Sequence, residues 1–284
     1  MSKAKSITLA IALGMLAPQA AHAAFDVTSN PILFWNDRAV TLFAGNAGVQ
    51  TRGLAMANIA MHDAVNSIVG HPSGSYLSGV SGSGGDVRAA IAQAAHDVLV
   101  VVNPANAAQY GQALTQSLAA IPDSPDKTNG RATGAAYAAA IVAMRSGDGS
   151  TNPNGITYTS TNLPGDYRVP GGGAAALPFW GEVAPFVQSS IDSLNIPPPP
   201  ALNSAAYAAA YNEVKGIGAA GSLTRTPDQT ASALFWDVSN GTTWVRAGLT
   251  IAADEQLSTL QYAQIFGRLT TGLADAFVVG MDSK

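Results

Sequence analysis

Two histidine-aspartate pairs are the residues of this sequence whose types and spacing most directly suggest chemistry. His62-Asp63 and His96-Asp97 each lie in a stretch with helical periodicity. Imidazole and carboxylate groups are ligands for divalent metals, so a divalent-metal phosphohydrolase that uses all four side chains is one hypothesis, provided that they converge. The alternative is structural, with His62, Asp63 and Asn66 cross-linking helices by hydrogen bonds inside a bundle.

The serine and cysteine content offers no motif for a nucleophile. No Gly-x-Ser-x-Gly elbow lies between a strand and a helix. The Gly/Ser-rich tract over residues 73–85 is typical of an exposed, mobile linker. No Gly-rich loop ending in Lys-Ser or Lys-Thr is present to cradle a phosphate. Cysteine is absent, which excludes disulfides, thiolate metal sites and cysteine nucleophiles.

A lysine closes the helix that we expect over residues 254–284. At about 100° per residue, Leu273, Phe277 and Gly280 share one side of that helix with Lys284. The cation therefore projects from an apolar stripe. Such a lysine either binds an anion or extends its ammonium group to water, and the spacing leaves both open.

Helical periodicity dominates the elements that must position these residues. We expect an all-α fold, a helical bundle with a long irregular Pro/Gly-rich loop over about 146–200 whose aromatic residues pack onto the helices. No alternation of strands with helices is present, so an α/β sheet is not expected. The predicted helices cover residues 31–45, 51–69, 86–102, 105–121, 125–145, 204–216, 226–238 and 254–284, the last capped by Asp254.

Composition limits the partners of this chain. Its 284 residues are 47% hydrophobic, which is enough for a sizeable core. Charged residues make up 11% of the chain and the net charge is -4. No cationic surface is available to attract nucleic acid or anionic lipid, so neither is expected as a partner.

The N-terminus has the features of an export signal. Lys3 and Lys5 precede an apolar run over residues 7–17, which is followed by the small-residue site Ala21-His22-Ala23. This pattern predicts a signal peptide over residues 1–23. The apolar run is too short to span a bilayer. We therefore expect residues 24–284 to form a single helical domain that is exported to the periplasm or beyond and is not held in a membrane after cleavage.

Several segments taken together resemble the bacterial vanadium-dependent haloperoxidase-like proteins, and the likeness covers most of the chain after residue 23. The segments are 52–66 with its core Ala-Met-His-Asp-Ala-Val-Asn, 164–168 (Pro-Gly-Asp-Tyr-Arg), 178–181 (Pro-Phe-Trp-Gly) ahead of Pro185-Phe186, 226–230 (Thr-Pro-Asp-Gln-Thr) leading to Phe235-Trp236, and 273–276 (Leu-Ala-Asp-Ala) before Asp282-Ser283-Lys284.

The resemblance assigns a role to Lys284. The family shares its active site with type 2 phosphatidic acid phosphatases. Its first motif is Lys, six residues, then Arg-Pro; its second is Pro-Ser-Gly-His; and its third ends in Arg and His. Lys284 matches the opening lysine, which implies that it binds an oxyanion, and the rest of these motifs does not occur in the sequence. The resemblance therefore implies the N-terminal portion of such a protein, without the C-terminal catalytic portion and inactive alone.

A second residue is assigned by the same resemblance, with a local departure from the family pattern. The family often has an acidic residue directly before the Gly in the turn that follows the Trp. Here Asn240 precedes Gly241 and the acidic residue, Asp237, comes earlier. Asp237 is therefore the candidate for orienting an arginine of the active site.

The chemistry implied for the full-length family is oxyanion chemistry. Vanadate and phosphate are tetrahedral anions held by Lys and Arg donors. The expected cofactor of the full-length protein is vanadate, and none is expected on this chain alone. The small-molecule substrates would be halide and peroxide, or a phosphomonoester in a phosphatase.

Two other hypotheses compete with this one. A non-catalytic helical scaffold that binds a partner protein would also explain the Ala-rich helices and the long aromatic loop. The two His-Asp pairs are similar to those of the HD phosphohydrolases, which keeps the metal hypothesis open for His62, Asp63, His96 and Asp97.

Overall fold

The computed structural model describes residues 25–43, 45–187, 196–237 and 240–283, and within these ranges the chain contains helices and no strand. This confirms the expected all-α fold. The α-helices are α2 (Pro31–Leu42), α3 (Ala47–Ile68), α4 (Val87–Val102), α5 (Ala107–Ala119), α6 (Pro125–Met144), α7 (Ala205–Gly218), α8 (Pro227–Trp236), α9 (Asn240–Ala253) and α10 (Thr259–Asp282), with short 3-10 turns η1 (Pro104–Asn106), η2 (Pro170–Gly172) and η3 (Trp180–Glu182).

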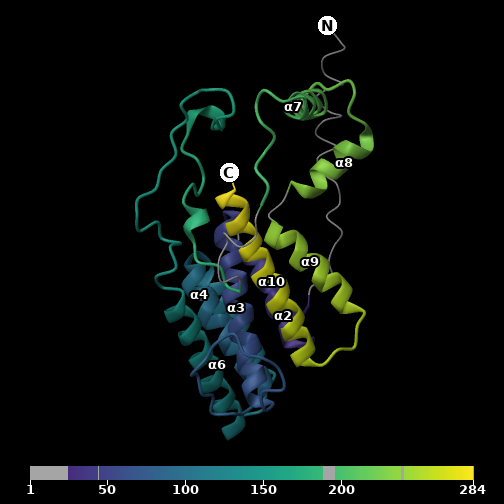
Figure 1. Ribbon diagram of the computed structural model, residues 1–284. Coiled ribbons are helices and arrows are strands. Elements are labelled where there is room, and N and C mark those ends of the chain that lie inside the picture. The colour runs from purple at the N-terminus through teal and green to yellow at the C-terminus, as the bar shows by residue number, and fades with distance from the viewer. Residues whose placement is uncertain (1–24, 44, 188–195, 238–239, 284) are drawn as a thin grey trace.

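Helix α3 is the centre of the bundle. It is buried along most of its length and packs against α4, α6 and α10, as Figure 1 shows. Its buried polar residues include Asn58, whose amide exchanges hydrogen bonds of 3.0 and 2.9 Å with the amide of Asn36 on α2. An amide pair that satisfies itself in this way can lie in a core without the cost of unpaired polar groups.

Helices α4 and α6 pack backbone to backbone where glycine replaces larger side chains. A Cβ at Gly134 of α6 would lie 2.2 Å from the carbonyl oxygen of Ala90 on α4, and one at Gly130 would lie 2.3 Å from the carbonyl oxygen of Asp86. A larger side chain at either glycine would therefore force the two helices apart.

The last helix begins later than the sequence predicted. Helix α9 runs through to Ala253, and α10 starts at Thr259. Ser258, not Asp254, is the N-cap, since Ser258 and Gln261 form a reciprocal capping box. Such a box satisfies two free N–H groups at once, whereas a lone carboxylate farther back leaves them to solvent.

The Gly/Ser tract over residues 73–85 is not the free linker that its composition predicted. Most of its residues are exposed, but Leu77 is buried and the backbone is held at both ends. Asp63 of α3 accepts hydrogen bonds from the N–H groups of Tyr76 and Leu77, and the hydroxyl of Thr133 on α6 accepts one from Ser83. Side-chain acceptors on two helices therefore anchor the tract to the bundle.

The long loop after α6 divides into two parts. The expectation that its aromatic residues pack onto the helices holds for the second part, where Trp180 is buried against α10. In the first part, Tyr158 and Tyr167 contact each other and remain exposed. The reason is that residues 151–176 are polar and Gly-rich around these two rings, so little apolar surface is gained by docking.

Helices α7 and α8 form an arm that extends away from the bundle (Figure 1). Neither helix has a buried residue. Both start as predicted, α7 with Ser204 as its cap and α8 with a capping box of Thr226 and Gln229 followed by Pro227 at the first helical position. Local capping, rather than burial, therefore defines these two helices.

The predicted signal peptide over residues 1–23 lies outside the described residues. In the part of the chain that is described, no helix combines the length and the apolar character needed to cross a bilayer.

Candidate functional site

An ion-pair network joins α3 to the end of α6. The Nε atoms of Arg52 and Arg145 lie 2.7 and 2.8 Å from the same carboxylate oxygen of Asp148. The side chains of Arg145 and Asp148 are only 4% and 3% exposed. Two cations share one carboxylate in a place that water reaches poorly, and Asp275 is a second anion whose charge acts on Arg145.

Burial and pairing oppose each other in this network. Burial alone would raise the pKa of Asp148, but hydrogen bonds from Arg52 and Ser150 and the charges of both arginines outweigh it and lower the pKa. Burial also lowers the pKa of Arg145, and the carboxylate of Asp148 counteracts it. The network is therefore a charged structural joint in which Asp148 is the shared anion.

Arg145 also fixes the segment that leaves the long loop. Its guanidinium donates to the carbonyl oxygens of Ala184 and Pro185 and lies over the ring of Phe186, 4.0 Å from the ring centroid. The backbone of Asp148 completes the attachment, because its carbonyl accepts from the N–H of Ala184. The segment is thus bound along one side by the end of α6.

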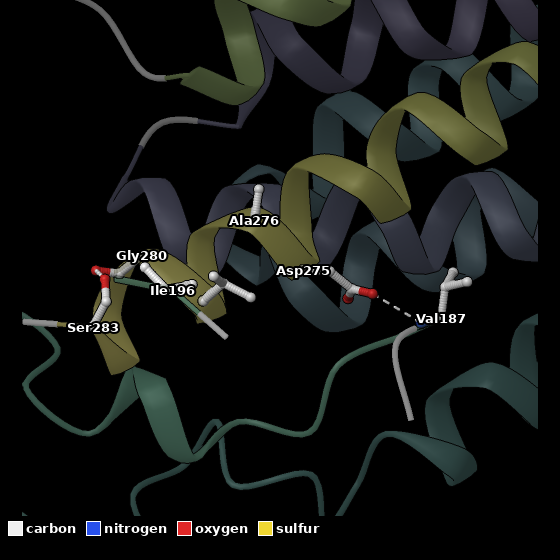
Figure 2. A pocket seen from close by; sticks show the side chains of 7 residues that line it. Val187, Ile196, Asp275, Ala276, Gly280 and Ser283 are labelled. Atoms are coloured by element: carbon white, nitrogen blue, oxygen red, sulfur yellow. Dashed lines mark hydrogen bonds between the residues drawn. The ribbon is translucent and has the colours of Figure 1, made fainter. Parts of the chain in front are cut away.

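Asp275 of α10 binds the same segment from the other side. Its two carboxylate oxygens accept hydrogen bonds from the N–H groups of Phe186 and Val187, at 2.6 and 2.9 Å. Figure 2 shows the bond to Val187. Residues 184–187 therefore join α6 to α10.

A small apolar cluster braces the last turns of α10. Trp180 packs edge-on against Phe277, with ring centroids 6.4 Å apart, and Val183 and Val278 complete the buried core of the cluster. Gly181 lies so close to α10 that a Cβ there would be 2.8 Å from the Cα of Asp282. Only glycine fits at that contact.

The opposite side of these turns is open and lines a shallow hollow of about 440 Å³. This volume is within the range of small-molecule sites. Figure 2 shows the lining, which comes from α10 and from the loop residues Val187 and Ile196. The residues of α10 that line it are Asp275, Ala276, Val279 and Gly280, and Ser283, the C-cap of α10, completes the lining.

The sequence predicted two residues for the oxyanion site, Lys284 and Asp237, and neither is among the described residues that line this hollow. Lys284 lies outside the described residues. Asp237 is exposed at the C-terminal end of α8 and makes no hydrogen bond or ion pair to a residue that the structure describes. The hollow and Asp237 therefore remain separate features of the described chain.

The two histidine-aspartate pairs stay separate as well. His62 and His96 each bond through Nδ1 to the neighbouring aspartate, at 2.7 Å in both cases. Asp97 also accepts from Gln93. Among the residues described, no three His, Asp or Glu side chains are placed to hold a metal ion together. The four residues of the metal hypothesis are thus two local pairs, and the structure offers no support for a shared metal.

The hydrogen bonds of His62, Asp63 and Asn66 differ from the predicted cross-links between helices. These three side chains hold the loop after α3 rather than another helix. His62 contacts Ser73, Asp63 accepts from backbone N–H groups of the loop, and Asn66 bonds to Ser73 and Ser75.

Several residues of these sites were missed from the sequence. Arg145, Asp148 and Ser73 carry no motif, and their partners are remote in the chain. Asp275 did give a signal, since it is a single carboxylate in the apolar stretch Leu273–Phe277. A charge in such a place requires partners, and here they are two backbone N–H groups.

Comparison of the chain with models of protein families, with curated proteins and with solved structures finds no match. The likeness to haloperoxidase-like proteins therefore rests on the sequence segments quoted above alone.

Proposed function

We propose that this chain is the helical scaffold of an exported vanadium-dependent haloperoxidase-like protein, with the oxyanion site at the C-terminal end of α10. One observation carries the proposal: two of the five segments that bear the resemblance, the one over residues 178–186 and the one over residues 273–284, meet at that end. Trp180 and Gly181 pack on Phe277 and Asp282, and Phe186 bonds to Asp275. The helix end that precedes Lys284 is thus held rigidly, as a binding site requires.

The described residues of the hollow do not by themselves fit vanadate. An oxyanion needs cationic or N–H donors, yet the one charged side chain among the described lining residues is the carboxylate of Asp275. The proposed role of Lys284 is to supply the first positive charge, and further cations and a histidine would come from polypeptide that follows it. The 284-residue chain alone is therefore expected to bind vanadate weakly and to be inactive.

The decisive experiment compares two lengths of chain. We expect no vanadate-dependent bromination by the purified 284-residue chain, and activity from a chain extended through the coding region after Lys284. In the extended chain, Lys284→Ala should abolish activity, whereas Lys215→Ala should not, since Lys215 is an exposed residue of the α7 arm.

Two outcomes would overturn the proposal. One is a downstream coding region without Arg-Pro seven residues after Lys284 and without any later Pro-Ser-Gly-His. The other is strong bromination by the 284-residue chain itself, because that chain contains none of these motifs.

A partner-binding scaffold is the second candidate, and exposed aromatic residues favour it. Phe235, Trp236 and Trp244 are 62%, 49% and 47% exposed, and their rings contact one another in series at 5.0 and 6.0 Å. Exposed aromatic clusters of this kind commonly mark interfaces. Recovery from cells of a folded 284-residue form, encoded with a natural stop codon after Lys284, would favour this candidate over the first.

A further inference from the structure

The loop that follows α3 brings a serine hydroxyl to a buried histidine-aspartate pair. The chain reverses through Gly70 and His71, both with positive φ (89° and 57°), and then through Pro72. This turn returns Ser73 to the last turns of α3. Its Oγ lies 3.3 Å from Nε2 of His62, whose Nδ1 lies 2.7 Å from Oδ1 of Asp63. The order of contacts is serine, histidine, aspartate.

The surroundings of Asp63 select the tautomer of His62. Asp63 is fully buried and accepts hydrogen bonds from the N–H groups of Tyr76 and Leu77, at 3.1 and 2.7 Å. An ionised carboxylate only accepts hydrogen bonds, so the Nδ1 of His62 must carry the proton. The lone pair of Nε2 then faces Ser73, which is the arrangement of a general base. The ring of Tyr76 packs edge-on against His62 and limits its rotation.

Asn66 positions the serine. Its Nδ2 donates to the carbonyl of Ser73 and to the hydroxyl of Ser75, at 2.9 and 3.1 Å. Its Oδ1 lies 2.8 Å from Oγ of Ser73, closer than Nε2 of His62. In the resting protein the hydroxyl proton therefore points to Asn66, and a rotation about the Cβ–Oγ bond turns it to His62. Catalytic hydrogen bonds are often long before a substrate is bound.

The surface beside Ser73 is open to a substrate. Ser73 is partly exposed and Gly74 is exposed. A Cβ added at Gly74 would meet no atom within 4 Å. The N–H groups of Gly74 and Ser75 donate to no residue that the structure describes. The N–H that directly follows a nucleophile is a common oxyanion donor, so Gly74 offers one.

We propose that Ser73, His62 and Asp63 form an acyl-transfer site that hydrolyses small carboxylic esters. Oγ of Ser73 attacks the ester carbonyl carbon as its proton passes to Nε2 of His62, and the oxyanion is bound by the N–H of Gly74. The intermediate collapses, the C–O bond to the leaving group breaks, and the alcohol departs with the proton from His62. Water then attacks the acyl-serine with His62 as base, which releases the acid and returns the proton to Ser73.

The openness around Gly74 defines the class of substrate. A Cβ at Gly74 would meet no atom within 4 Å, so no wall encloses an acyl chain there, and short acyl groups with good leaving groups are the expected substrates. This site is independent of the oxyanion proposal, since it shares no residue with the end of α10.

The test uses the whole 284-residue chain with 4-nitrophenyl acetate and a fluorophosphonate probe. We expect the probe to label Ser73, identified by peptide mass spectrometry. Ser73→Ala should remove both the label and the esterase activity. His62→Gln should lower the rates of labelling and hydrolysis by about 100-fold or more, the usual contribution of a general base. Ser81→Ala, at an exposed serine of the same loop, should change neither.

A folded protein that leaves Ser73 unlabelled, while a known serine hydrolase is labelled in parallel, would show that Ser73 only anchors the loop. Labelling at another residue, or hydrolysis that survives His62→Gln, would overturn the proposal as well. If Ser73→Ala fails to fold, two other measurements decide whether Ser73 and His62 form the site. They are the position of the label in the wild-type chain and the rate of ester hydrolysis by His62→Gln. None of these results bears on bromination by the extended chain.

Discussion

Asp148 is the residue on which the joint between α3, α6 and the long loop depends. It is the common anion of Arg52 and Arg145, and Arg145 in turn holds the backbone of Ala184 and Pro185. Removing one partner of a buried ion pair leaves the other charge unsatisfied, which costs more than the pair contributes.

We therefore expect Asp148→Asn to destabilise the fold by about 3 kcal/mol at neutral pH. The pKa of Asp148 is lowered in the folded state, so its contribution is full above the ordinary value of 3.8 and is lost as the pH falls through the folded pKa. The free energies of unfolding of the variant and the wild type, measured with urea, should become more alike at pH values below 3.8.

The control for this variant is Asp228→Asn, at an exposed aspartate in the first turn of α8, where we expect a change below about 1 kcal/mol. If Asp148→Asn lowers the free energy of unfolding by the same amount at all pH values, the ionised carboxylate is not what stabilises the joint.

Helix contacts in this bundle depend on small residues, and α4 with α6 is the clearest case. Gly134 of α6 faces the backbone of Ala90 and Ala94 on α4, and Gly130 faces that of Asp86, the N-cap of α4, so the two backbones touch. A glycine inside a helix normally destabilises it, so its presence on α6 is explained by this contact.

Gly134→Ala should lower the free energy of unfolding by about 2 kcal/mol or more, because the added methyl would lie 2.2 Å from the carbonyl oxygen of Ala90 and the backbones must separate. Gly111→Ala is the matched comparison. Gly111 lies within α5 and a Cβ there meets nothing within 4 Å, so that change should stabilise by about 0.5–1 kcal/mol. Denaturant unfolding measures the change in the free energy of unfolding for both variants. If both variants were stabilised, or both destabilised, the close contact at Gly134 would be contradicted.

At the scale of the whole molecule, the bundle and its excursions differ in how firmly they are held. Helices α2, α3, α4, α6 and α10 share one apolar core. Residues 151–176 and the α7 and α8 arm add little to it. Segments with few buried contacts open at low free energy.

Limited trypsin digestion should therefore cut first after Arg168 and Lys215, which are exposed on the loop and on the arm, and should spare Arg52 and Arg145 in the ion-pair network. Mass spectrometry of the early fragments gives the order. Early cleavage after Arg145 would mean that the joint at Asp148 opens as easily as the excursions.

Local features of the chain are readable without the fold. Helical periodicity predicted most helices. Ser204 and Thr226 cap two of them through N–H groups of the first turn, so these helix starts depend on local sequence. The predicted start of α10 at Asp254 was wrong, because Ser258 forms the capping box with Gln261. Composition alone also misjudged residues 73–85, since their anchors are Asp63 and Thr133 on two helices.

The meeting of polar side chains required the packed molecule. Arg52 and Asp148 are separated by 96 residues, and Phe186 and Asp275 by 89. Such contacts follow from which helix faces which, and a single sequence does not specify that. From the sequence, His62 and Asp63 were visible only as a pair, and their proposed chemistry depends on Ser73. Ser73 reaches them because the chain turns back through Gly70 and His71, and Asn66 holds it there.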